Sequence, residues 1–236
     1  MAKFNNIVIL TGSGISVASG IPTYRAEDGV WEKYNIEDVA TPEGFNRDPE
    51  NVLKFYNEQR KKLTAENIKP NAAHHALAKL QKEHKGKVTI ITQNIDDLHE
   101  QAGAKVLHVH GSLLEAKCLK CFKPVEWRGD INIGDKCQLC EHHAQLRPNV
   151  VWFAEMPYYI DQSFDAVREA DLFISIGTSG QVYPIAGLIY DVPSNSHSIE
   201  MNLEDGENNH LFKESRHGDA TITVPELVDE ILASNE

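Results

Sequence analysis

Four cysteines form the strongest metal-binding pattern in this sequence. They stand in two Cys-x-x-Cys pairs, Cys118 with Cys121 and Cys137 with Cys140, separated by 15 residues. Each pair can present two thiolates to one ion, and two pairs complete a tetrahedral zinc site. Four thiolates leave the ion no open coordination position, so we expect a structural role and no catalysis. The alternative is a set of reduced, buried cysteines without a metal.

A glycine turn near the N-terminus has the chemistry of a phosphate site. Gly12 and Gly14 follow the apolar run 7–10 and let the backbone turn tightly with no Cβ in the way. Ser16 and Ser19 are candidate caps for a helix that starts here. Unpaired N–H groups at a helix start and the helix dipole both favour an anion. The turn therefore predicts a dinucleotide site, and a tight turn without ligand is the alternative.

The turn departs from the fingerprint of dehydrogenases. Val17 stands where the third glycine would be, and no acidic residue follows a second strand about 20 residues further on. A hydride-transfer enzyme is therefore a poor fit, although the nucleotide-binding fold itself is retained. Asn202 and Glu204 follow a late strand and are candidates for the ribose contact instead.

Two histidines supply candidates for a general base. His108 and His110 end a short apolar strand, where a histidine can transfer protons near neutral pH. Alternation along a strand puts both on the same side, so the pattern alone does not choose between them. His110 is nearer the strand end, beside Gly111, and is the predicted base. A structural role is the alternative for a lone histidine.

Strands alternate with helices over most of the chain, and these elements must position the candidate residues. We expect strands at 7–10, 88–92, 106–109, 171–176, 198–203 and 220–224, and helices at 49–63, 71–83, 98–101, 163–170 and 225–232. The alternation predicts a Rossmann-like α/β fold, a mostly parallel sheet with helices on both faces. Ligands of such sheets bind at the carboxyl ends of the strands. Four polar or glycine-rich strand ends therefore predict one site, at 12–14, 93–96, 177–179 and 202–204.

The composition is that of a soluble globular protein. Its 41% hydrophobic and 25% charged residues are ordinary values, and no apolar run approaches the roughly 20 residues of a membrane span. The N-terminus lacks an apolar signal region, so a cytoplasmic protein is expected. The net charge of −12 argues against nucleic acid and favours small molecules or basic peptides as partners. Acidic residues in the cysteine segment weaken a nucleic-acid role for the zinc module: Glu115, Glu126, Asp130, Asp135 and Glu141.

Taken together, these motifs resemble the sirtuin family of NAD-dependent protein lysine deacylases. They occur in the family's order from residue 7 to about residue 232, and their order and spacing are highly specific: 12–16, 20–25, 93–96, 108–111, the two cysteine pairs, 177–179 and 202–204. The resemblance is closest to small bacterial members that pair an acyl-pocket alanine with a Tyr-x-x-Arg motif, a desuccinylase-like class.

The resemblance implies NAD as a consumed co-substrate and zinc as a structural ion. His110 and Asn94 would be the catalytic residues, with His110 as general base, while Asp96 would grip the carboxamide of NAD. The cofactor contacts would be Gly12, Ser13, Gly14, Ile15, Tyr24, Arg25, Gln93, Asn94, Ile95, Asp96, Gly177, Thr178, Ser179, Asn202, Leu203, Glu204 and Ala220.

The resemblance also implies an acyl-lysine protein or peptide as substrate. The peptide would lie between two extended segments, 151–155 and 180–184, by backbone pairing that tolerates many sequences. The substrate contacts would be Ala40, Tyr56, Val151, Phe153, Ala154, Glu155, Val182 and Tyr183. In the family's reaction the acyl oxygen displaces nicotinamide, and the products are free lysine and O-acyl-ADP-ribose. The alternatives are a mono-ADP-ribosyltransferase and a non-enzymatic NAD-binding regulator.

We predict two domains with the ligand cleft between them. Residues 1–26, 70–111 and 147–236 would form the Rossmann-like NAD-binding domain. The small domain would combine a helical part, 27–69, with a zinc-ribbon part, 112–146.

Three positions depart from the family pattern. Ser13 replaces the commoner Ala, and Ala154 replaces a Gly, which restricts the backbone if that position needs a positive φ. Gln59 stands where the Tyr-x-x-Arg motif has its Arg, and Arg60 follows one position later. Arg binds the carboxylate of a succinyl or malonyl group bidentately, and neutral Gln cannot replace that charge. Arg60 is turned by about 100° from Gln59 on a helix, which leaves its reach open. We expect retained deacetylation with weakened or altered desuccinylation.

Overall fold

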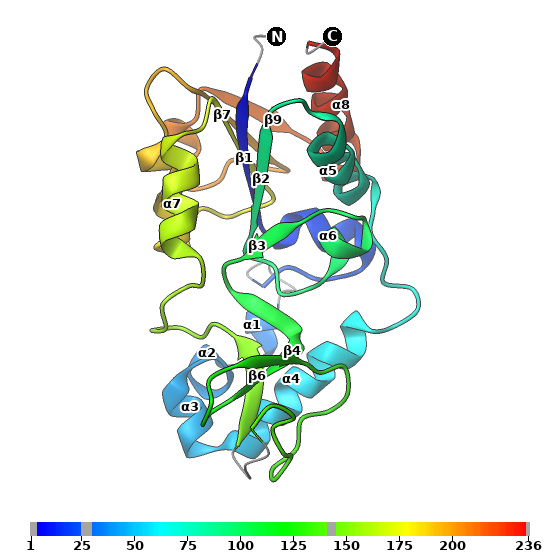
Figure 1. The fold of residues 1–236 in the computed structure, drawn as a ribbon, viewed down its shortest axis with the longest axis vertical. Helices are drawn as coiled ribbons and strands as arrows, with labels where there is room; N and C mark the ends of the chain where they lie inside the picture. The colour runs from blue at the N-terminus through cyan, green and yellow to red at the C-terminus, as the bar shows by residue number, and fades with distance from the viewer. Residues whose placement is uncertain (1–3, 25–29, 141–144, 235–236) are drawn as a thin grey trace.

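A parallel sheet of six strands forms the larger lobe of the structure (Figure 1). The computed structural model describes residues 4–24, 30–140 and 145–234. The strand order is β3-β2-β1-β7-β8-β9, so the chain winds outward from β1 and again from β7. This is the doubly wound order of Rossmann-like folds, and the predicted fold class is confirmed. The strands are β1 (Asn6–Thr11), β2 (Lys87–Thr92), β3 (Val106–His108), β7 (Leu172–Ile176), β8 (His197–Asn202) and β9 (Glu214–His217).

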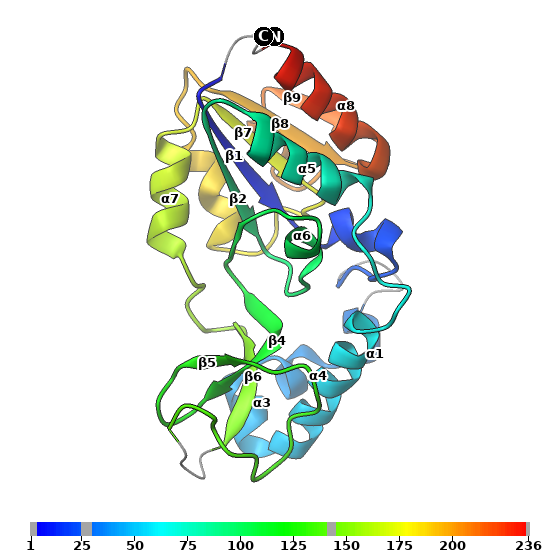
Figure 2. The same ribbon diagram turned by 45° about the vertical axis from the view of Figure 1, so that its right-hand side comes forward.

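Helices cover both faces of this sheet. Helices α5 (Ala72–Glu83) and α8 (Ala220–Ala233) lie side by side on one face, and α7 (Ile160–Arg168) lies on the other with the 3₁₀ helix η2 (Ile185–Asp191), as Figure 2 shows for α5, α8 and α7. Alternation along β1 supplies both cores. Ile7 and Ile9 pack toward α5 and α8, whereas Val8 and Leu10 pack toward α7 and η2. All four are almost completely buried, as expected for a strand covered on both faces.

Capping residues begin two helices within one residue of the predicted start. Helix α4 runs over Pro49–Leu63, with Pro49 in its first turn and the Asp48 carboxylate accepting a hydrogen bond from the Asn51 backbone N–H at 3.0 Å. Asn71 caps α5 in the same way. The short helix α6 (Leu98–Gln101) also lies where it was predicted.

The C-terminal region corrects one prediction. Residues 220–224 were expected to form a strand because Thr, Ile, Thr and Val favour that state, but they form the first turns of α8. The Asp219 carboxylate caps the helix by accepting from the Thr221 N–H at 2.8 Å. Val224 joins the buried face that α8 packs against α5, so tertiary packing outweighs the local preference. The sequence also missed β9, a short polar strand at the sheet edge.

The smaller lobe combines helices with an antiparallel sheet. Helices α1 (Val30–Lys33), α2 (Ile36–Val39), α3 (Pro42–Arg47) and α4 lie against strands β5 (Pro124–Glu126), β4 (Gly111–Cys118) and β6 (Leu146–Val150). One hydrophobic cluster joins Phe45 and Phe55 of the helices to Leu113 and Leu146 of the sheet. The helical and cysteine-bearing segments therefore share a core. Strand β6 extends past the predicted boundary at residue 146, and the domain limits stay a prediction.

Arg60 is part of this core, although it carries a charge. It is 1% exposed, and its Nε donates to the Leu113 carbonyl at 2.8 Å while Nη1 donates to the Asn57 Oδ1 at 2.7 Å. Asn57 in turn bonds both backbone groups of Ile131 at 2.9 Å. Burial lowers the pKa of Arg60 to about 10, which leaves it charged at neutral pH. Arg60 thus ties α4 to the small sheet.

Within the described residues, none of the helices combines the length and apolar character that crossing a bilayer requires.

We predict that Arg60→Ala lowers the free energy of unfolding by about 3 kcal/mol, because it leaves the buried Leu113 carbonyl without a donor and empties a filled site. Thermal or urea unfolding measures this. Gln59→Ala, one residue away and half-buried, is the matched control and should cost less than about 1 kcal/mol. Equal losses in the two variants would contradict the assignment of Arg60 to the core.

Candidate active site

Two glycine loops meet where the strand order reverses, between β1 and β7. Gly12 donates its N–H to the Ile176 carbonyl at 3.0 Å, and Gly14 donates to the Gly177 carbonyl at 2.9 Å. A Cβ on Gly14 would lie 2.6 Å from the Gly177 Cα, and Gly177 itself has a φ of 63°. The loops touch backbone to backbone because neither carries a side chain there. This switch point is where doubly wound sheets bind nucleotides.

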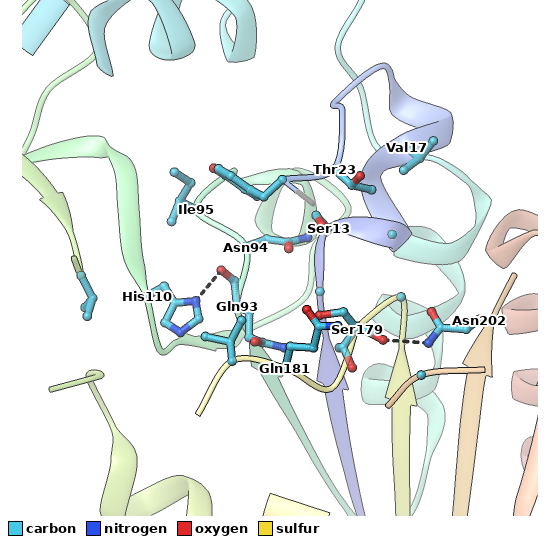
Figure 3. Close-up of a pocket in the computed structure, with 18 of the residues that line it drawn as sticks. Ser13, Val17, Thr23, Gln93, Asn94, Ile95, His110, Ser179, Gln181 and Asn202 are labelled. Atoms are coloured by element: carbon cyan, nitrogen blue, oxygen red, sulfur yellow. Dashed lines mark hydrogen bonds between the residues drawn. The ribbon is translucent and has the colours of Figure 1, made fainter. Parts of the chain in front are cut away.

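A cavity of about 1110 Å³ opens at this edge of the sheet. It exceeds the 300 to about 1,000 Å³ of ordinary small-ligand pockets, so it has room for a large ligand or for two. In Figure 3, His110, Gln93 and Ile95 lie on one side of it, while Ser179 and Asn202 lie on the other.

Most of the predicted NAD and substrate residues line this single cavity. The sheet edge contributes Gly12, Ser13, Gly14, Gly177, Thr178, Ser179, Asn202, Leu203, Glu204 and Ala220. The loop after the 3₁₀ helix η1 (Ser13–Ser19) and the segments after β2 and β3 contribute Tyr24, Gln93, Asn94, Ile95 and His110. The predicted substrate residues Ala40, Tyr56, Val151, Phe153, Ala154, Glu155, Val182 and Tyr183 also line it. Three predicted residues differ: Ile15 is buried in the large core, Asp96 lines a neighbouring cavity, and Arg25 lies outside the described residues.

The structure separates the two candidate histidines. His110 lines the cavity, and its Nδ1 lies 3.1 Å from the Gln93 carbonyl, an acceptor that requires the proton on Nδ1 for this hydrogen bond. Both nitrogens of His108 are engaged, Nδ1 with the Asn94 carbonyl at 2.9 Å and Nε2 with Glu100 at 2.7 Å. Burial alone would lower the pKa of His108, but Glu100 outweighs it and the net shift is upward. Of these two histidines, His110 is the one that lines the cavity.

Ser16 has a different role from the one predicted. The 3₁₀ helix η1 (Ser13–Ser19) begins after Gly12 without a side-chain cap. The Ser16 hydroxyl instead donates to the Asp96 Oδ2 at 3.2 Å and accepts from the Asn94 Nδ2 at 3.2 Å. Ser19 bonds the Asn71 side chain at 3.0 Å, so it caps nothing either. Ser16 joins residues far apart in the sequence, and no spacing pattern could have revealed this contact.

Asp96 is an unusual carboxylate because it is 5% exposed and no cation pairs with it among the described residues. Burial raises its pKa to about 6, against the opposing effects of the Leu98 N–H and the Ser16 hydroxyl. A carboxyl with such a pKa titrates near physiological pH.

The first predicted peptide segment is a turn and carries no strand. Strand β6 ends at Val150, and the Glu155 carboxylate closes the turn by accepting from the Trp152 N–H at 2.8 Å and from Arg147 at 2.7 and 2.9 Å. These bonds hold a turn where an extended segment was expected at 151–155. Ala154 has a φ of 69°, the conformation in which a side chain is strained. The second segment, 180–184, is also a turn and leads into η2.

Tyr56 and Gln59 reach the cavity from α4, whereas Arg60 does not line it. The Trp152 Nε1 donates to the Tyr56 hydroxyl at 3.0 Å, and the Arg147 guanidinium stacks 3.3 Å from the Trp152 ring centre. The question that the sequence left open is therefore answered: the turn of the helix directs Arg60 into the core.

Several further lining residues were not predicted. Trp152 and Gln181 lie inside the two predicted peptide segments, so their only signal was that they neighbour predicted substrate residues. Thr23 lies inside the 20–25 motif, which was its signal, whereas Val17, Phe55 and Glu207 reach the cavity through folding of their loops or helix.

The four cysteines have the geometry of a zinc site. Their sulfur atoms all lie within 4.8 Å of one another, with Cys118 to Cys140 at 3.8 Å and Cys121 to Cys137 at 3.7 Å. A tetrahedron with Zn–S bonds of about 2.3 Å has edges of about 3.8 Å. The backbone N–H groups of Lys120 and Leu139 point at Cys118 and Cys137 at 3.4 Å, which favours thiolates. The donor set fits structural zinc.

Comparison with known proteins agrees with this site. The profile of the Sir2 family matches residues 12–184. An NAD-dependent protein deacylase of Vibrio cholerae is 54% identical, over 98% of this chain and 95% of its own length.

The chain belongs to the Sir2 family. An NAD-dependent protein deacylase of Escherichia coli O157:H7 is 49% identical, over 96% of this chain and 84% of its own length. A Sir2 homologue solved with NAD superposes with a TM-score of 0.88 at 38% identity, covering 99% of this chain and 91% of that one. A Sir2 protein solved with a myristoylated histone peptide has a TM-score of 0.75 at 31% identity, covering 99% and 94%. The sirtuin resemblance drawn from the sequence is confirmed.

We predict that removing zinc from this Sir2 protein unfolds the small lobe. Cys118 and Cys137 are buried in the cluster that also holds Val52 and Leu113, so loss of the ion disturbs the shared core. A strong chelator, or Cys137→Ser, should lower the melting temperature and abolish turnover, and zinc added to the chelated protein should restore both. Metal analysis should give one zinc per chain; a fully stable, metal-free protein would contradict the assignment.

The family resemblance implies that the Asp96 carboxylate binds the carboxamide of NAD. On that basis we predict that NAD affinity falls as the pH decreases through about 6, where this carboxylate, whose pKa is raised, becomes protonated and loses accepting capacity. Calorimetric titration of NAD between about pH 5 and pH 7.5 measures this. Asp96→Asn should bind NAD weakly and without this pH dependence. A flat profile in the unmodified protein would show that Asp96 does not contact the dinucleotide through its carboxylate.

Proposed function

We propose that this protein removes acyl groups from lysine side chains of other proteins and consumes NAD, with release of nicotinamide and O-acyl-ADP-ribose. The observation that carries the proposal is the single cavity in which His110, the switch-point glycine loops and the Ala40–Tyr56 wall face one another. Relatives that match 96–98% of the chain are NAD-dependent protein deacylases, which supports the same activity here.

The sheet edge binds the dinucleotide. Backbone N–H groups of the touching glycine loops lie at the strand ends, where phosphate oxygens are accepted. The Asn202 amide donates to the Thr178 carbonyl at 2.7 Å, which leaves its oxygen to accept from a ribose hydroxyl beside Glu204. NAD supplies the ribose carbon from which nicotinamide leaves when the acyl oxygen attacks.

His110 accepts the proton of the reaction. Its Nδ1–H donates to the Gln93 carbonyl, so the imidazole is fixed in the tautomer whose Nε2 is basic. Nε2 can then take a proton from a ribose hydroxyl at the same side of the cavity. The Asn94 side chain donates to the Ser16 hydroxyl, and its backbone carbonyl contacts the His108 Nδ1. These two contacts orient the loop that follows β2.

The acyl-lysine enters between the turns at 151–155 and 180–184. Val151, Phe153 and Ala154 of the first turn and Val182 and Tyr183 of the second all line the cavity, and the peptide backbone lies between these turns. Ala40 is small, and Gln59 stands in the pocket where a desuccinylase-like pocket has Arg. We therefore include weakened desuccinylation with retained deacetylation in this proposal. The cytoplasmic location and the lack of nucleic-acid binding stay predictions of the sequence.

We predict that His110→Ala lowers kcat/KM on an acetyl-lysine peptide by about 10²–10⁴-fold, the usual contribution of a general base. Mass spectrometry of the products follows the loss of the acetyl group and the appearance of O-acetyl-ADP-ribose. His75→Ala, an exposed histidine on α5, is the matched control and should leave both unchanged.

The same measurement separates the alternatives. ADP-ribosyl transfer would release nicotinamide and add mass to the acceptor while the acyl group stays on lysine. A non-enzymatic regulator would bind NAD without forming either product. Either result would overturn the deacylase proposal.

A further inference from the structure

Gln59 lines the acyl end of the cavity and carries a buried, unsatisfied hydrogen-bond donor. It lines the active-site cavity together with Tyr56 and also borders a second cavity of about 260 Å³. Its Nε2 is buried, and no acceptor among the described residues lies within hydrogen-bond distance. Buried amide donors are nearly always paired in native structures, so an unpaired one beside a binding cavity indicates a group that a ligand is meant to satisfy.

The cavity offers no cation to a charged acyl tail. Among the described residues that line it, the charged side chains are the acids Glu155, Glu204, Asp205 and Glu207, with neither lysine nor arginine. Arg60 is engaged with Leu113 and Asn57, and Arg147 is paired with Glu155. Lys62 borders the second cavity only, and it is exposed. A carboxylate placed beside Gln59 would therefore lose its hydration without gaining a counter-charge.

Tyr56 provides a second neutral donor next to Gln59. Its hydroxyl oxygen accepts from the Trp152 Nε1 at 3.0 Å, so its own proton remains for another acceptor. Burial raises the pKa of Tyr56, which keeps the hydroxyl protonated. Ala40, Phe55 and Ile95 supply apolar walls around the two donors. This end of the cavity thus combines apolar surface with uncharged hydrogen-bonding groups.

We propose that Gln59 makes this enzyme selective for acyl groups that end in an uncharged hydrogen-bonding group, such as an amide or a ketone carbonyl, over dicarboxylic acyl groups of the same length. The inference rests on the proposed deacylase function. A terminal primary amide fits best, because it can accept from the Gln59 Nε2 and donate to the Gln59 oxygen at the same time. A carboxylate can only accept hydrogen bonds. Its negative charge would also be repelled by the partial negative charge of the Gln59 side-chain oxygen.

Three lysine acyl groups of nearly equal shape test the proposal on one peptide. Succinamoyl ends in an amide, succinyl in a carboxylate, and 4-methylpentanoyl in two methyl groups; acetyl-lysine reports the basic activity. We expect kcat/KM for succinamoyl to exceed that for succinyl by about tenfold or more, the range of one hydrogen bond to a charged group made or lost. It should also exceed that for 4-methylpentanoyl. Each value is divided by the acetyl value of the same variant.

Variants at position 59 separate charge from shape. Gln59→Arg should reverse the order and favour succinyl, because it supplies the bidentate cation. Gln59→Glu should depress succinyl further, and Gln59→Met should abolish the advantage of succinamoyl over 4-methylpentanoyl. The melting temperature of each variant reports folding, and the wild-type ratios test the proposal even if one variant does not fold. Lys62→Ala tests the remaining nearby cation and should leave the ratios unchanged.

Three results would overturn the proposal. One is a wild-type enzyme that turns over succinyl as well as succinamoyl, the second is a succinyl activity that collapses in Lys62→Ala, and the third is equal turnover of succinamoyl and 4-methylpentanoyl. In each case acetyl-lysine is still deacetylated, so the deacylase function stands. If no acyl peptide, acetyl included, consumes NAD, the proposed function itself fails and the inference fails with it.

Discussion

The structure depends on a backbone contact between two glycine loops. The hydrogen bond from Gly14 to Gly177 joins the segment after β1 to the segment after β7, and a Cβ at either glycine would fall under 3.0 Å from the other loop. Contacts this close leave no room for a side chain, so the carboxyl ends of β1 and β7 are fixed next to each other at the same level of the sheet. The edge of the cavity that Ser13 and Ser179 line is built on that contact. A single added methyl group would separate the loops and deform the edge.

His110 lies where the chain crosses between the lobes. Its carbonyl accepts from the Val151 N–H at 2.9 Å, and the preceding Val109 carbonyl accepts from the Tyr158 N–H at 2.9 Å. Strand β4 starts at the next residue, Gly111, whose φ of 79° lets the chain turn into the small sheet. The outgoing and returning segments are therefore bonded to each other beside the base. Backbone hydrogen bonds thus tie His110 to the segment that returns from the small lobe, whereas Ala40, Tyr56 and Gln59 all belong to the small lobe itself.

The features that depend on residues close in sequence were predicted correctly. Asp48 and Pro49 set the start of α4, short apolar runs placed β1 and β2, and cysteine spacing grouped the four sulfur atoms that fit zinc. The polar residues and glycines at the strand ends predicted most of the cavity lining, although they come from distant segments of the chain. This worked because parallel strands bring their carboxyl ends to one edge of the sheet. The failures came from long-range contacts. The residue types at 220–224 favour a strand, but packing of α8 against α5 outweighs this local preference. Ser16 was assigned a cap because its contact with Asp96 spans 80 positions. Arg60 could be placed only once β4 lay beside α4.

The sheet order also fixes when the active site can form as the protein is synthesised. Strand β1 leaves the ribosome first, but its neighbours in the sheet are β2 and β7, and β7 begins only at Leu172. Until then Gly14 has no Gly177 to bond, and the edge of β1 that receives β7 stays open. Contacts so distant in sequence form slowly compared with local ones. The first glycine loop to be translated is thus among the last to be completed, and the nascent chain must keep an apolar strand edge covered during most of its elongation.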